Sequence, residues 1–325
     1  MDQESLRMSE DVRIAVRRCL SDLRSSTILV ACSGGADSLA LARAVAAEAP
    51  RVDVQAIAIV VDHDLQVGSA AVADRAAQQC RDLGLETEVV RVTVVTSGDG
   101  LESAARDARY AALNAAADRW GADAILLGHT MEDQAETVLM RLSRGSGARS
   151  LAGIPAQSGR LLRPLLGVPR STVRAYVADL DPWEDPHNFD PTMLRPRVRS
   201  ELLPLVSDVL GAGAIAGLAR TASLLRADSE ALDEWAAREY ERLALRVGNS
   251  IEFEVPKLLG LPEAVRTRAI RLACHACGCP NGSLGFDHIF VVHGFLVDWH
   301  GQGAATLPGG VTAQRRYDRL CLTGD

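Results

Sequence analysis

The sequence contains no long apolar run, and no stretch approaches the roughly 20 apolar residues that a helix needs to span a bilayer. Its N-terminus is polar and of mixed charge, unlike a secretory signal peptide. Its seven cysteines are scattered and odd in number, which favours free thiols in a reducing compartment over a disulfide framework. We therefore expect a cytoplasmic protein with no membrane partner.

Lysine is also scarce, although arginine is abundant. Lys257 is the only lysine, and the formal net charge of the 325 residues is −7. Such a chain is not a general nucleic-acid binder, although it can still carry a local basic surface. Its length favours two domains, and its hydrophobic content of 47% is enough to bury a large interior.

One loop carries the strongest chemical signal. The apolar run 27–32 predicts a strand, Ser-Gly-Gly-Ala-Asp-Ser follows at 33–38, and helix-forming residues continue to Glu48. Glycines allow close approach to a ligand and a helix N-terminus attracts anions, so this order suits a phosphate. The plain alternative is a set of helix-capping residues.

The same loop resembles the PP-loop of enzymes that cleave ATP between its α- and β-phosphates, and it lacks the lysine of the kinase and GTPase loop. The candidate nucleotide-binding residues are Ser33, Gly34, Gly35, Ala36, Asp37 and Ser38. A carboxylate beside a triphosphate is repelled unless it shares Mg²⁺, so Asp37 is also the candidate metal ligand.

Strand and helix patterns alternate through the first half of the chain. Strands are expected at 52–61, 86–92, 124–127 and 161–166, and helices at 69–82, 101–120, 132–142 and 171–180. This alternation predicts an α/β fold with a doubly wound parallel sheet. Ligands of such sheets bind at the carboxyl ends of the strands.

Two carboxylates follow the fourth expected strand. Asp133 and Glu136 share one helix face, where they could hold a metal, accept hydrogen bonds from a base or orient an amine. They could equally complement the helix dipole. His63 and His129 also follow strands, but no metal-ligand spacing links them, and packing or capping is their default role.

Arginines are concentrated further on. Ten arginines and five acidic residues lie between Arg141 and Arg199, which gives this stretch a local charge of +5. Arginine forks fit phosphates and base edges, although charged stretches are often only solvated surface.

Several ordered motifs over about residues 27–205 resemble the tRNA(Ile)-lysidine synthetase family. They are Leu101-Glu-x-Ala-Ala-Arg-x-x-Arg-Tyr110, Gly128-His-x-x-x-Asp-Gln-Ala-Glu-Thr-Val-Leu139, Arg141-Leu-Ser-Arg-Gly-Ser-Gly147, Arg163-Pro-Leu-Leu166, Glu184-Asp-Pro-x-Asn188 and Arg195-x-Arg-x-Arg199. One departure is Glu132, where the family often has a second aspartate. The chain looks like the short form, with one C-terminal domain.

The resemblance implies an adenine nucleotide α-hydrolase-like catalytic domain at 1–208 and a smaller, mostly helical tRNA-binding domain at 209–325. It also implies a ligase that uses ATP and Mg²⁺. ATP would adenylate the C2 oxygen of the wobble cytidine, position 34, of tRNA(Ile) with a CAU anticodon, releasing pyrophosphate. The ε-amine of free lysine would then replace AMP and form lysidine.

The roles implied by the resemblance fall into three groups. Val61 and Asp62 would lie against adenine, beside the PP-loop. The catalytic residues would be Asp37, Asp133, Glu136, Arg195 and Arg199. The tRNA-binding residues would be Arg109, Arg141, Arg144, Arg195, Arg197 and Arg199.

Other classes of protein remain alternatives at this stage. A PP-loop tRNA thiolase would need cysteine pairs, and Cys274, Cys277 and Cys279 offer no complete metal-ligand set, which favours free thiols. A small-molecule amidating PP-loop enzyme would need no basic surface, and a tRNA-binding module would not cleave ATP. The helical second domain could also serve as a homodimer interface.

Overall fold

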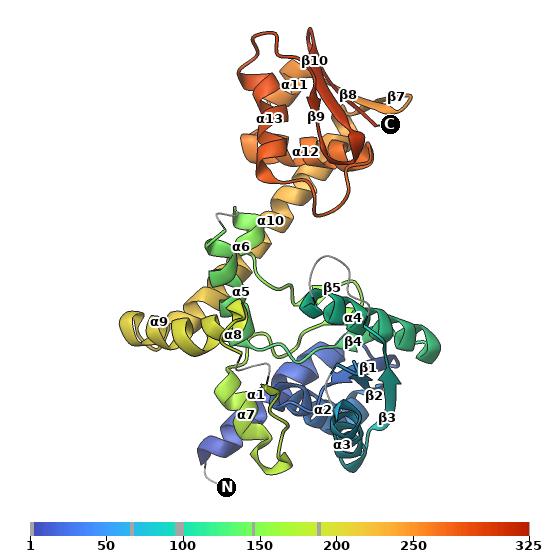
Figure 1. The fold of residues 1–325 in the computed structure, drawn as a ribbon, viewed down its shortest axis with the longest axis vertical. Coiled ribbons are helices and arrows are strands. Elements are labelled where there is room, and N and C mark those ends of the chain that lie inside the picture. The colour runs from blue at the N-terminus through green and yellow to red at the C-terminus, as the bar shows by residue number, and fades with distance from the viewer. Residues whose placement is uncertain (1–2, 66–67, 95–100, 145–146, 187–189, 325) are drawn as a thin grey trace. The chain divides into compact units, whose positions relative to one another are not determined.

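The computed structural model describes residues 3–65, 68–94, 101–144, 147–186 and 190–324. The chain forms two compact units, Met1–Arg226 and Ala227–Asp325 (Figure 1). A functional boundary after residue 208 stays a prediction. Gly145, Ser146 and Asn188, which belong to the motifs above, lie outside the described residues.

A six-stranded sheet with the order β3-β2-β1-β4-β6-β5 forms the centre of the first unit. Its strands are β1 (Thr27–Cys32), β2 (Gln55–Asp62), β3 (Glu86–Arg91), β4 (Ala124–Leu126), β5 (Gln157–Ser158) and β6 (Leu161–Leu162). All neighbours pair in parallel except β5 and β6. The predicted doubly wound α/β fold is confirmed, and the chain order reverses between β1 and β4, where such sheets bind ligands.

Helices cover both faces of this sheet (Figure 1). On one face α1 (Gln3–Ser21), α2 (Ala36–Glu48), α3 (Ser69–Asp82) and α7 (Arg170–Tyr176) enclose a core with Ile28 and Val30 of β1. On the other face α4 (Leu101–Trp120) packs on Leu29. Alternate residues of β1 therefore point into two cores, which explains why the strand is apolar throughout.

The rest of the first unit is mostly helical. It contains α5 (Met131–Leu142), α6 (Ala148–Leu151), α8 (Leu194–Arg197), a π-helical turn at Val198–Leu202, α9 (Leu203–Leu210) and the start of α10 (Ala214–Leu243), with short 3₁₀ turns at Ala49–Val52 and Ala178–Leu180. The strand expected at 161–166 ends at Leu162, because the chain turns there and the Leu166 N–H donates to the Arg163 carbonyl.

The second unit combines helices with a five-stranded antiparallel sheet of order β7-β8-β11-β10-β9. Its strands are β7 (Leu245–Val247), β8 (Ser250–Glu254), β9 (Ala305–Thr306), β10 (Thr312–Arg316) and β11 (Arg319–Thr323), and its helices are α11 (Val255–Leu259), α12 (Glu263–Ala276) and α13 (Phe286–Val297), with a 3₁₀ turn at Pro308–Gly310. Phe253 is fully buried at the centre of its core. Directly after α10, β7 pairs antiparallel with β8.

Within the described ranges no single helix is long and apolar enough to cross a membrane. By length and composition alone one strongly bent pair, Leu194–Leu210 with Ala214–Leu243, passes that test.

Candidate active site

The PP-loop connects β1 to α2 and is closed by serine hydroxyls. The backbone N–H of Ser33 donates to Ser38 Oγ at 3.0 Å, and Ser38 Oγ donates to the Gly35 carbonyl at 2.9 Å. Gly34 has a φ of +81°, a conformation that side chains disfavour, and a Cβ there would lie 3.0 Å from that of Ala76. The loop is therefore a compact turn at the start of a 13-residue helix, whose free N–H groups suit phosphate.

A second glycine, Gly128, lets the chain after β4 approach the start of α2 closely. Gly128 follows β4, and a Cβ there would lie 2.7 Å from the carbonyl oxygen of Asp37. The residues after β4 consequently pack directly against the first turn of α2. This contact brings the segment that carries Asp133 next to the PP-loop.

Asp37 carries a half-buried carboxylate that is only partly compensated by its surroundings. Its Oδ1 is buried without a hydrogen-bond partner, and its Oδ2 lies 3.5 Å from Nε of Arg170. Burial raises the pKa of Asp37 to about 6, although Arg170 opposes the shift. An orphaned carboxylate oxygen beside a phosphate loop is a suitable ligand for a hard cation.

Asp133 and Glu136 form an ion-pair cluster with three arginines, Arg170, Arg195 and Arg199. Asp133 Oδ1 lies 3.0–3.1 Å from all three guanidiniums. Glu136 is fully buried and bonds the same three at 3.2, 2.9 and 2.7 Å. Arg195 and Arg199 reach it from successive turns, α8 and the π-helical turn.

The remaining oxygen of Asp133 belongs to the capping box of α5. Oδ2 accepts the backbone N–H of Thr130 at 2.7 Å and its hydroxyl at 2.9 Å. Burial alone would raise the pKa of Asp133, but Arg170, Arg195 and the Thr130 N–H outweigh it and hold the pKa at about 2. Asp133 is therefore ionised, and both carboxylates contact guanidiniums.

Arg170 was missed as a site residue by the sequence analysis. It is the first residue of α7, its side chain is only 11% exposed, and it touches Asp37, Asp133 and Glu136. Its only sequence signal was membership of the arginine-rich stretch. The structure singles it out as the link between the PP-loop and the acidic pair.

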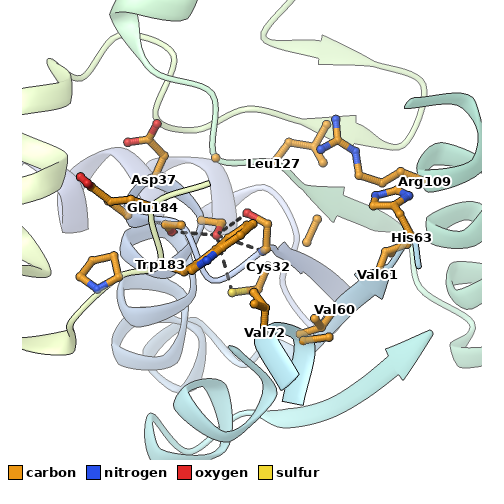
Figure 2. Close-up of a pocket in the computed structure, with 18 of the residues that line it drawn as sticks. Cys32, Asp37, Val60, Val61, His63, Val72, Arg109, Leu127, Trp183 and Glu184 are labelled. Atoms are coloured by element: carbon orange, nitrogen blue, oxygen red, sulfur yellow. Dashed lines mark hydrogen bonds between the residues drawn. The ribbon is translucent and has the colours of Figure 1, made fainter. Parts of the chain in front are cut away.

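A cavity of about 980 Å³ opens beside the PP-loop (Figure 2). Its wall contains the whole of the predicted nucleotide set except Gly34, together with Asp133, Arg109 and Arg199. Figure 2 shows His63 and Arg109 together near Val61, and Trp183 near Cys32. The backbone N–H of Trp183 donates to the Gly34 carbonyl at 3.0 Å. Trp183 therefore lines the cavity on the side of the PP-loop.

The side chain of Asp62 is already engaged. It accepts hydrogen bonds from the Asp64 N–H at 3.0 Å and from Arg91 Nε at 3.3 Å. Burial opposes ionisation, but these donors and Ser69 lower its pKa. The Asp62 carboxylate is therefore held by these donors rather than turned toward a ligand.

Of the other predicted arginines, some line a second cavity and one lies on the surface. Arg141, Arg144 and Arg195 line a second cavity of about 220 Å³. Arg197 is exposed and pairs with Glu201 at 3.1 Å, so the structure does not bring it to either cavity. In the second unit, Cys274 is buried in the core and Cys277 Sγ donates to the Leu322 carbonyl at 3.3 Å.

The PP-loop at the point where the strand order reverses, with a large cavity at the strand ends, defines a PP-loop ATP-binding protein. The family model described as the PP-loop domain matches residues 8–206, and the TilS substrate binding domain matches residues 253–321.

Curated relatives match almost the whole chain. The tRNA(Ile)-lysidine synthase of Thermobifida fusca is 49% identical over 97% of this chain and 97% of its own. That of Streptomyces coelicolor is 50% identical over 91% of this chain and 84% of its own. The chain belongs to the tRNA(Ile)-lysidine synthase family of PP-loop ligases.

A solved structure shares the fold at greater distance. The U34-tRNA thiolase NcsA of Methanococcus maripaludis, solved with its [4Fe-4S] cluster, has a TM-score of 0.58 and 21% identity. The match covers 67% of this chain and 80% of the thiolase. The thiolase alternative has this likeness of fold alone, whereas the synthases match in sequence over nearly their full length.

Proposed function

We propose that this protein ligates free L-lysine to C2 of the wobble cytidine, position 34, of tRNA(Ile) with a CAU anticodon. ATP adenylates the C2 oxygen and pyrophosphate leaves. The lysine ε-amine then adds to C2, AMP departs with its electron pair, and the amine loses a proton, which gives lysidine. The observation that carries the proposal is the ion-pair cluster of Asp133 and Glu136, which Arg170 joins to the PP-loop.

The PP-loop is the proposed cradle for the β- and γ-phosphates. Ser33, Ser38 and the backbone of Gly34, Gly35 and Ala36 surround the start of α2, and the adenine lies against the backbone at Val61 and Asp62. Most of the acceleration then comes from holding the weakly nucleophilic cytosine O2 in line with the α-phosphate.

Magnesium fits this site through Asp37 and the phosphates together. The free Oδ1 of Asp37 is suited to it, and no group of three metal-ligating side chains gathers in the described part of the chain. When bound, Mg²⁺ supplies positive charge to the departing pyrophosphate. Asp37 would hold the ion, and Arg170 lies 3.5 Å from the same carboxylate.

The ion-pair cluster is the proposed acceptor side of the reaction. Arg170, Arg195 and Arg199 offset charge on the transferring phosphate, and Asp133 and Glu136 keep them in place. Both carboxylates are saturated by guanidiniums, so cytidine or the lysine ammonium reaches them only by replacing one of these cations. Arg109, Arg141, Arg144 and Arg197 are the remaining proposed tRNA contacts.

We also propose that the enzyme is cytoplasmic and forms a homodimer. The seven free thiols support a reducing compartment. Exposed Leu205, Val209 and Leu210 on α9 support self-association, which the mass of the protein in solution would test.

One set of reactions tests the function. Pyrophosphate release and lysine incorporation are measured with ATP, lysine and tRNA(Ile), omitting each in turn, and with tRNA(Met), which shares the CAU anticodon, as control. We expect release to require tRNA(Ile) and incorporation to require all three. Sulfur transfer, or pyrophosphate release without tRNA, would favour a thiolase or a small-molecule ligase instead.

Asp133→Asn and Asp37→Ala test the assigned residues. Each is expected to lose lysine incorporation, while Asp123→Asn, on an exposed turn before β4, keeps it. Normal incorporation by either site variant removes that residue from the proposal.

A further inference from the structure

The second cavity is unusually rich in positive charge. Its wall carries Arg106 of α4, Arg141 of α5, Arg144 in the turn after α5, and Arg195 of α8, and none of the described residues that line it is a carboxylate. Burial and the positive charges of Arg226, Arg144 and Arg106 lower the pKa of Arg141. Arg195 is already paired with Asp133 and Glu136, but the four guanidiniums around a space of about 220 Å³ would still attract an anion.

These arginines are held in place before any ligand arrives. Nη1 of Arg141 donates to the carbonyls of Ser150 and Gly153 at 2.9 and 3.0 Å. Arg195 is fixed by Glu136 at 2.9 Å, and the Arg106 guanidinium lies 5.1 Å from the centre of the Tyr110 ring. Such preorganisation lowers the entropy cost of binding.

His129 separates this cavity from the nucleotide cavity and lines both. Its Nδ1 is buried without a hydrogen-bond partner, and burial lowers the pKa of the ring to about 4, so it is neutral at working pH. An unpartnered ring nitrogen adds a hydrogen-bonding group to the arginines. Because the two cavities share this wall, a group in the second lies beside the bound nucleotide.

We propose that the second cavity binds a backbone phosphodiester adjacent to the wobble cytidine. This inference rests on the proposed function and names the part of the tRNA that this cavity holds. One substrate carboxylate would be satisfied by one arginine fork, whereas four guanidiniums suit a chain of phosphates that enters past the exposed Arg144. Holding the phosphate fixes the base in register over the ATP.

Arg106→Gln and Arg144→Gln test the proposal, because both side chains are exposed and neither holds the fold. Arg220→Gln, on an exposed part of α10 outside both cavities, is the charge-matched control. The readouts are the KM for tRNA in pyrophosphate release without lysine, its dependence on salt, and the KM for lysine in the complete reaction.

We expect each site variant to raise the KM for tRNA about tenfold or more and to flatten its salt dependence by about one charge. The KM values for ATP and lysine should stay unchanged. A methylphosphonate beside the cytidine should weaken the wild type but add little to the Arg106→Gln Arg144→Gln double variant.

Two results would overturn the proposal. One is a KM for tRNA, with its salt dependence, that equals the wild-type value in both variants. The other is an increase confined to the KM for lysine, which would assign the cavity to the substrate carboxylate. Failure of the wild-type protein to release pyrophosphate with tRNA would instead refute the proposed function, so the two failures are distinguishable.

Discussion

The carboxylate of Glu132 accepts the backbone N–H of Arg170 at 2.8 Å. This bond ties the first turn of α5 to the first residue of α7, where a negative charge also complements the helix dipole. It fixes the backbone from which the Arg170 side chain reaches Asp37, Asp133 and Glu136. Glu132, the one visible departure from the family motif, therefore anchors the arginine on which the cluster depends.

Replacing Arg170 is expected to slow adenylation. A lysine keeps the charge but cannot bridge three carboxylates, so Arg170→Lys and Arg170→Gln should reduce kcat for pyrophosphate release by about 10²–10³-fold. Arg160→Lys is the matched control, because its ion pair with Asp118 lies on the surface. Near wild-type release by both Arg170 variants would remove this residue from the reaction.

Neutralising Glu136 is expected to unfold the site. The side chain is fully buried and balances three guanidiniums, so Glu136→Gln leaves excess positive charge in the interior. Breaking a buried ion pair in this way typically costs about 3–5 kcal/mol, which urea denaturation would measure. Glu201→Gln, at an exposed ion pair, should change stability far less. Equal stability of the two variants would contradict the role of Glu136.

Ionised Asp37 is expected to lower the free energy of unfolding at pH values above its folded-state pKa. Burial raises the pKa to about 6 from 3.8, so the folded state prefers the protonated form. That contribution is complete below pH 3.8 and is lost as the pH rises through 6. Asp37→Asn should therefore be more stable than wild type at pH 7.5, by up to about 3 kcal/mol, and similar near pH 4.

Thermal unfolding with and without MgATP completes this test. MgATP should raise the melting temperature of the wild type but not that of Asp37→Asn. A variant less stable than wild type at pH 7.5 would contradict the raised pKa.

Adding one methyl group at Gly128 is expected to weaken nucleotide binding. A Cβ there would lie 2.7 Å from the Asp37 carbonyl and 3.1 Å from the Ser38 nitrogen, so the PP-loop must shift. Gly128→Ala should weaken ATP binding by at least tenfold in calorimetry. Gly167→Ala, which has open space at its Cβ, should bind ATP as the wild type does. Unimpaired binding by Gly128→Ala would contradict the close packing described here.

Local patterns predicted the parts of the fold that depend on neighbours in sequence. Strand 27–32, the PP-loop and helices 69–82 and 101–120 were found because apolar pattern and turn residues coincide there. The strand β5 was not found because it is only two residues long and both are exposed. The hairpin of β10 and β11 was not found, although its strands are adjacent in sequence, because Thr312–Arg316 is mostly polar and shows no clear apolar alternation.

In the candidate site too, the sequence showed the residues that are close together along the chain but not their distant partners. Asp133 and Glu136 were visible as a spaced pair, but their three guanidinium partners come from positions 34 to 66 residues away. No spacing rule links Arg170 to Asp37, and no pattern shows that a carboxylate is already occupied. Such contacts exist only once the sheet brings strand ends together.

The five-residue cluster has an evolutionary consequence. Each charged side chain in it contacts partners that contact the other members of the cluster, so the effects of single changes do not add. A substitution at one of these positions leaves several unmatched charges, and the loss is repaired only by compensating changes at the others. Lineages should therefore retain or exchange Asp133, Glu136, Arg170, Arg195 and Arg199 as a set.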